Sequence, residues 1–67
     1  MGKPFKTYRV RYHQEQYIPE YRFIYTKWCS YKHQGEYIWF KTPDAAIDYI
    51  RQQTESRVFV ELYEEQG

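Results

Sequence analysis

The sequence has little of what stabilises or activates many small proteins. It holds one cysteine, Cys29, which excludes an internal disulfide, so the fold must depend on a hydrophobic core. Its three glycines, Gly2, Gly35 and Gly67, stand far apart, which excludes a glycine-rich phosphate-binding loop. No apolar run is long enough to span a bilayer, and the first residues lack the apolar segment of an export signal. We therefore expect a cytoplasmic protein that has no membrane partner.

Side chains that carry catalysis or bind metals are also sparse. His13 and His33 do not combine with Cys29 in any spacing that is typical of zinc sites. Asp44 and Asp48 form an i,i+4 pair, which suits a solvated helix face near a helix N-terminus better than acid–base catalysis. We expect no catalytic residue, no metal and no cofactor, and hence a protein that is not an enzyme.

Aromatic residues are abundant instead: they make up 22% of the chain, and nine of its 67 residues are tyrosine. Tyrosine favours strands, and it can bury its ring while its hydroxyl reaches water. The net charge is only +1, but it is unevenly distributed. Residues 1–42 carry eight Lys or Arg and three Glu (+5), whereas residues 43–67 carry two Arg and six acids (−4). Positive charge is therefore concentrated in the first two thirds of the chain.

The hydrophobic pattern predicts three strands before the helix. Residues 5–13 alternate with period two, residues 20–31 are rich in aromatic and β-branched side chains, and residues 36–41 follow a hairpin turn at KHQG. Residues 13–20 are predicted to be a polar connection, because Pro19 lacks the amide donor that a strand interior needs.

A helix and a last strand complete the pattern. Thr42 is a good N-cap and Pro43 suits the first helical position, so the helix should run from there to about Gln53. Residues 57–63 alternate again. A helical crossover joins parallel strands, which places this last strand beside the first.

The predicted fold is a single α+β domain over residues 1–67, with residues 1–4 and 64–67 as flexible ends. Its element order is β-β-β-α-β, with one helix on one face of a curved, mainly antiparallel four-stranded sheet. The predicted strand order is 3-2-1-4. The residues expected to form the core are Tyr8, Val10, Ile24, Trp28, Ile38, Phe40, Ala46, Ile47, Ile50, Val58, Val60 and Leu62.

One helix covers only one face of such a sheet, so the other face should be exposed. Monomers seldom expose so large an apolar area unless it is an interaction site. The predicted partner-binding residues on this face are Arg9, Arg11, Tyr21, Phe23, Tyr25, Lys27, Tyr37, Trp39, Lys41 and Phe59.

Three interpretations of that face compete. The first is a non-catalytic, aromatic and basic surface for a protein partner, as in an inhibitor, an adaptor or a homodimer, in an accessory or regulatory protein of phage type. The second is a nucleic-acid-binding module, either a stacking platform for single strands or a sheet in a DNA groove; the acids of the last strand oppose it. In the third, the loop around Pro19 folds over the face and the aromatic residues are core.

One stretch bears on the nucleic-acid interpretation. WFKTPDAAIDYI resembles the strand, Thr-Pro cap and helix start of small β-β-β-α domains, including the sheet-reading DNA-binding domains of phage-type integrases and of a plant transcription-factor family. The resemblance covers about a fifth of the chain and transfers no functional residue. The additional C-terminal strand and the acidic end depart from that pattern.

Overall fold

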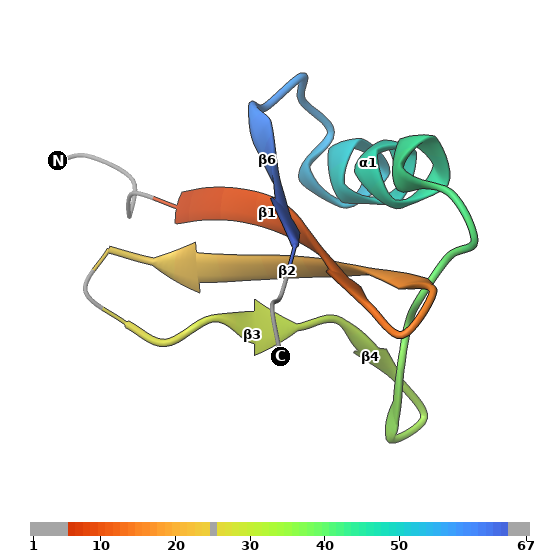
Figure 1. Cartoon of the computed structure of the whole chain (residues 1–67). Helices are drawn as coiled ribbons and strands as arrows, with labels where there is room; N and C mark the ends of the chain where they lie inside the picture. The colour runs from red at the N-terminus through yellow and green to blue at the C-terminus, as the bar shows by residue number, and fades with distance from the viewer. Residues whose placement is uncertain (1–5, 25, 65–67) are drawn as a thin grey trace, which may run out of the picture.

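The computed structural model describes residues 6–24 and 26–64 of the chain (Figure 1). These residues form six strands and one helix. In chain order the elements are β1 (Lys6–His13), β2 (Gln16–Phe23), β3 (Cys29–Ser30), β4 (Lys32–His33), β5 (Glu36–Tyr37), α1 (Pro43–Thr54) and β6 (Val60–Glu64).

A four-stranded sheet in the order β3-β2-β1-β6 is the centre of the fold. β1 pairs antiparallel with β2 and parallel with β6, and β2 pairs antiparallel with β3. Figure 1 shows α1 on one side of this sheet. The predicted α+β fold, with the last strand added in parallel beside the first, is confirmed.

The β1–β2 hairpin differs from the prediction, because β2 begins at Gln16 and includes Pro19. The turn is only two residues long, and both Gln14 (φ 51°) and Glu15 (φ 64°) are left-handed, as in the hairpin turns whose twist matches that of paired strands. The Pro19 carbonyl accepts from Tyr31 N at 3.5 Å, one residue beyond the β2–β3 pairing. The N and C=O groups of a strand residue point to the same side, so the Pro19 nitrogen faces β3 and not β1. The missing amide therefore removes no hydrogen bond from the β1–β2 ladder.

The predicted long strand, residues 20–31, is wrong beyond Phe23. There the chain turns, and Thr26 donates to the Phe23 carbonyl from both its amide (3.1 Å) and its hydroxyl (2.8 Å). The chain returns to the sheet as the two-residue β3. β3 therefore occupies the edge position beside β2 that was predicted for residues 36–41.

Residues 32–41 form a separate arm. β4 and β5 pair as a small second sheet around a turn at Gln34 (φ 53°) and Gly35 (φ 83°), which confirms the predicted hairpin. Phe40 then makes an isolated bridge with Tyr17, and each of these residues donates its amide to the other's carbonyl at 2.9 Å. The predicted strand 36–41 is thus only partly regular.

Helix α1 follows its capping chemistry. Thr42 is extended, and its hydroxyl accepts from the Ala45 amide at 3.2 Å. Pro43 occupies the first turn, where no amide donor is required. At the other end Glu55 is left-handed (φ 56°), and the Ser56 amide bonds to the Arg51 carbonyl at 3.3 Å. Both predicted ends of the helix are confirmed to within a residue.

The core lies between α1 and the sheet. Val10, Ala46 and Ile50 are fully buried at its centre. Residues that pack against them are Tyr8, Tyr17, Tyr31, Phe40, Ile47, Val58 and Val60. Four predicted core residues lie outside it. Ile24 and Leu62 are largely exposed, Trp28 lies over Arg9 of β1, and Ile38, which follows β5, does not belong to this cluster.

Candidate functional site

The pairing register decides which side chains share a face, because residues that pair directly point to the same side of a sheet. Val10 belongs to the core beneath α1, so its β1 neighbours Arg9 and Arg11 point away from the helix. Tyr21 pairs with Tyr8, and Phe23 with Lys6, which places both rings on the helix side. The predicted grouping of Tyr21 and Phe23 with the two arginines is therefore wrong. The two-residue turn at residues 14 and 15 fixes the β1–β2 register and therefore which β2 side chains point to the helix side.

On the face away from α1, a buried carboxylate binds two arginines. Glu20 is only 4% exposed. Its Oε1 accepts from Arg9 Nε at 2.6 Å, and its Oε2 accepts from Arg11 Nε at 2.8 Å and from the Ser30 hydroxyl at 3.2 Å. The predicted basic residues of β1 are thus present on this face, but they are paired within the chain.

Two aromatic rings cover the same cluster. The guanidinium carbon of Arg9 lies 4.2 Å from the centre of the Trp28 ring and 4.4 Å from that of Tyr63. The guanidinium carbon of Arg22 lies 4.7 Å from the Trp28 ring. Planar guanidinium groups stack favourably on aromatic faces. Much of the face that was expected to be open is therefore covered by the protein's own side chains.

The other predicted contact residues do not gather on one surface. Tyr37 and Trp39 are exposed on the arm, where Lys32 Nζ lies 4.9 Å from the Tyr37 ring. Lys41 borders a hollow with Trp39, while Lys27 is exposed in the β2–β3 connection. Phe59 lies before β6, and Tyr25 lies outside the described residues. Their role in binding stays a prediction.

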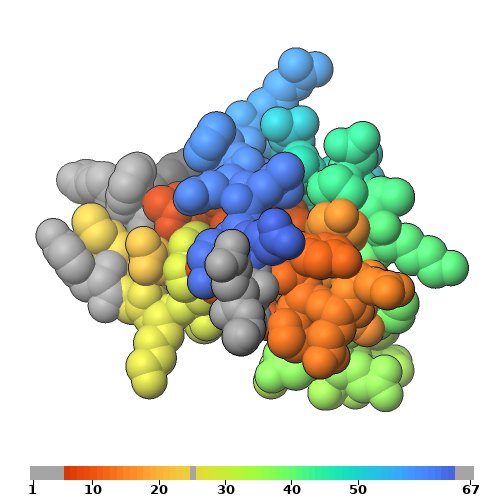
Figure 2. Space-filling view, in the orientation of Figure 1, coloured from red at the N-terminus to blue at the C-terminus, as the bar shows by residue number. Residues whose placement is uncertain are grey.

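Three of the exposed large apolar residues flank or belong to β6. Phe59 is 83% exposed, Leu62 59% and Tyr63 42%. Within residues 6–24 and 26–64, β6 pairs with β1 and with no strand on its other side. Figure 2 shows the side chains of β6 at the surface, near the centre of the view. Sequence reasoning missed Leu62 and Tyr63 as surface contacts, although the predicted strand order already placed this strand at an edge.

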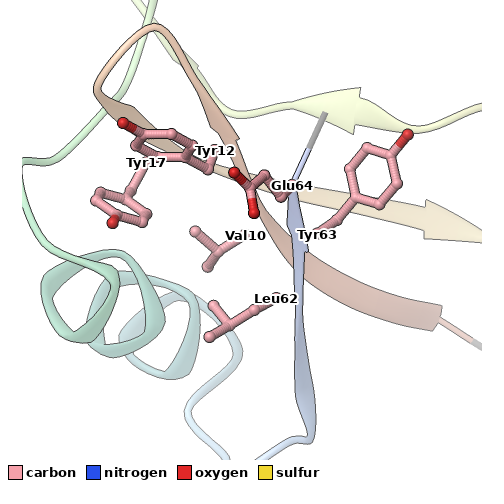
Figure 3. Close-up of a pocket in the computed structure, with 6 residues that line it drawn as sticks. All are labelled: Val10, Tyr12, Tyr17, Leu62, Tyr63 and Glu64. Atoms are coloured by element: carbon pink, nitrogen blue, oxygen red, sulfur yellow. The ribbon is translucent and has the colours of Figure 1, made fainter. Parts of the chain in front are cut away.

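A pocket of about 300 Å³ adjoins β6 on the helix side of the sheet (Figure 3). Leu62 and Glu64 point into it beside Val10, and Tyr63 points to the opposite side of β6. The rings of Tyr12 and Tyr17, whose centres are 4.9 Å apart, form a further wall. The pocket thus combines an apolar base with phenol and carboxylate groups at its rim.

Two phenols that pack against the buried core have a raised pKa. Burial raises the pKa of Tyr31 to about 12, with smaller contributions from the nearby Tyr8, Tyr21 and Tyr49, and burial also raises the pKa of Tyr8. These phenols pack within the hydrophobic core or against it, so their shifts reflect packing.

Residues 6–24 and 26–64 hold neither a candidate metal site nor a helix that could span a membrane. Their acids, histidines and cysteine form no cluster of three or more that is suited to hold a metal ion. None of their helical segments has the length and apolar character that spanning a membrane requires.

Neither the family models, nor the curated proteins, nor the solved structures gave a match to this chain.

Proposed function

We propose that this protein is a non-catalytic protein-binding domain that associates with its partner by pairing a strand with the free edge of β6. The observation that carries the proposal is the combination of an unpaired five-residue edge, among the described residues, with the exposed apolar side chains of Phe59, Leu62 and Tyr63. An added strand gains main-chain hydrogen bonds along the edge, and alternate side chains provide specificity.

The two edges of the sheet differ in a way that supports this role. Proteins usually protect edge strands by keeping them very short or by placing Lys or Pro in them. The edge strand β3 is protected by its shortness, since it is only two residues long. β6 is longer and its sequence, VELYE, contains neither residue. Its two glutamates provide charge, while Leu62 and Tyr63 remain available for contact.

The paired arginines favour a protein partner over nucleic acid. Arg9 and Arg11 were the residues best placed to meet phosphates, but Glu20 accepts hydrogen bonds from both. Glu61 and Glu64 add negative charge to the exposed edge, and negative charge repels a phosphate backbone. Tyr37 and Trp39 remain predicted contact residues at a second surface on the arm.

The experiment is a selection of ten-residue peptides displayed in random sequence, followed by titration of the selected peptides into the isotopically labelled protein. We expect amide signals of residues 60–64 to shift, and Leu62→Lys to abolish binding. Ile24→Lys is the matched control, because it changes another exposed apolar residue (48% exposed) outside β6. It should bind as the unmodified protein does.

Two outcomes would contradict the proposal. Selected peptides that shift signals elsewhere and bind the Leu62→Lys variant normally would remove β6 as the binding surface. Salt-sensitive quenching of tryptophan fluorescence by mixed-sequence oligonucleotides, in the absence of any peptide binding, would favour the nucleic-acid alternative.

A further inference from the structure

We infer that the strand that pairs with β6 is β6 of a second copy of this chain, antiparallel and centred on Leu62. The inference rests on the proposed role of the β6 edge and names its partner. Two four-stranded sheets would then join into one continuous sheet, with the helices of both copies on the same side.

Symmetry restricts the register of such a pair. In a twofold dimer each contact occurs twice, so a residue on the axis faces its own copy. With Leu62 on the axis, Leu62 faces the partner's Leu62. Glu61 then faces the partner's Tyr63, and Val60 faces the partner's Glu64. All five residues of β6 pair, and no carboxylate faces another.

Neighbouring symmetric registers are less favourable. With Glu61 on the axis, two carboxylates would lie directly opposite each other, and like charges in that position are destabilising. With Tyr63 on the axis, the exposed Leu62 would face the partner's Glu64, and fewer residues of β6 would pair. The charge pattern of VELYE therefore selects the register centred on Leu62.

The side chains on the helix side match across this interface. Val10 of β1 pairs with Leu62 of β6, and both residues border the pocket of Figure 3. The Leu62 register continues this row through the partner's Leu62 to the partner's Val10. Four apolar residues would thus form an unbroken row across the joined sheets. This row would cover Leu62, the most exposed apolar side chain of β6.

The opposite face is matched in charge. There Arg9 pairs with Glu61, and Arg11 pairs with Tyr63. In the dimer a row runs from Arg9 through Glu61 to the partner's Tyr63 and the partner's Arg11. Positive charge lies at both ends of the row, with the carboxylate and the phenol between them. Cross-strand neighbours of this kind lie about 4.5–5.5 Å apart at Cβ, within reach of a hydrogen bond from the phenol to the carboxylate.

The first test is the molar mass in solution, from light scattering over a range of concentrations. We expect a species of twice the 8.4 kDa chain mass that dissociates on dilution. Leu62→Lys should be monomeric, while Ile24→Lys stays dimeric. At dilutions where the unmodified protein is also monomeric, Leu62→Lys should unfold at the same urea midpoint as the unmodified protein, which shows that its fold is intact. A chain that is monomeric even at millimolar concentration would overturn the inference.

The second test fixes the register with engineered disulfides in a Cys29→Ser background. Leu62→Cys should form a covalent dimer on mild oxidation, because the Cα atoms of facing residues lie within the range that a disulfide bridges. Glu61→Cys and Tyr63→Cys should each fail alone and should cross-link when the two variants are mixed. Efficient cross-linking of Tyr63→Cys alone would overturn this register.

Failure of the dimer is distinguishable from failure of the proposed function. A monomer whose β6 signals still shift with selected peptides keeps β6 as a protein-binding edge and removes only the second copy as its partner. A monomer that binds no peptide at β6 contradicts both.

Discussion

Glu20 and Arg9 form an ion pair on the face of the sheet that α1 does not cover, with 2.6 Å between Arg9 Nε and Glu20 Oε1. They face each other across the β1–β2 ladder, so the backbone register itself brings them together. Arg11 and Ser30 complete the set of donors around the carboxylate. A side chain that the sequence presents as one of nine acids is thereby the most buried charged group among the described residues.

Replacing this carboxylate should destabilise the fold strongly. Glu20→Gln leaves Arg9 and Arg11 without the charge they pair with, and breaking a buried pair costs about 3–5 kcal/mol. Urea unfolding followed by tryptophan fluorescence measures the change in free energy of unfolding. Glu36→Gln, at an exposed position of β5, is the control and should change it by less than about 0.5 kcal/mol. Equal effects of the two substitutions would show that the ion pair contributes little.

The two tryptophans should respond differently to substitution. Trp28 lies against Arg9 and Arg22, so Trp28→Leu should lower the free energy of unfolding by about 1–2 kcal/mol, since stacking of this kind is worth about 0.5–2 kcal/mol. Trp39 is 45% exposed, and Trp39→Leu should leave stability nearly unchanged. The same unfolding experiment measures both. A larger loss from Trp39→Leu would place that residue, instead of Trp28, among the structural contacts.

Better turn residues should stabilise the β1–β2 hairpin. Gln14 and Glu15 are both left-handed, a conformation that Asn and Gly adopt at lower cost. Gln14→Asn with Glu15→Gly should raise the free energy of unfolding by about 0.5–1 kcal/mol, which corresponds to a rise of about 2–8 °C in the melting temperature. Calorimetry measures this shift.

The opposite kind of substitution, from glycine to a residue with a side chain, can be made in the β4–β5 hairpin. Gly35 has φ 83°, and a Cβ built there would meet nothing within 4 Å, so Gly35→Ala tests backbone strain alone. It should lower the melting temperature. An unchanged value would mean that left-handed strain is not a significant cost in these turns.

Alkaline pH should unfold the protein through its half-buried core phenols. The raised pKa of Tyr31 means that the folded state holds this proton more tightly than the unfolded state does. The resulting stability is fully present below the ordinary pKa of 10.0 and is lost as pH rises towards about 12. Circular dichroism across this interval should show unfolding that Tyr31→Phe shifts to higher pH. Tyr37→Phe, at an exposed residue, should leave the transition where it is; equal shifts would contradict the assignment.

The sequence predicted the order of elements well and the faces of the sheet poorly. The Thr42–Pro43 cap identified the helix, and the rules for crossovers then placed β6 beside β1. The sequence did not show which β2 side chains point to the helix side. One reason is that Gln14-Glu15 is not a usual pair for a two-residue hairpin, and the other is that Pro19 argued against a strand. Its missing amide falls just beyond the β2–β3 pairing, which only the tertiary structure shows. The placement of Trp28 over Arg9 depends on the connection between β2 and β3, whose path has no periodic signal.

The position of β1 between β2 and β6 also sets the order of folding events. The β1–β2 hairpin closes through a two-residue turn, and hairpins of this kind form in about 1–10 μs. Pairing of Tyr8 with Val60 instead brings together residues from nearly opposite ends of the chain, with the loop-closure entropy that this separation implies. We expect an early hairpin whose outer β1 edge stays open until the helix and β6 dock, so the rate-limiting step is the arrival of the last strand.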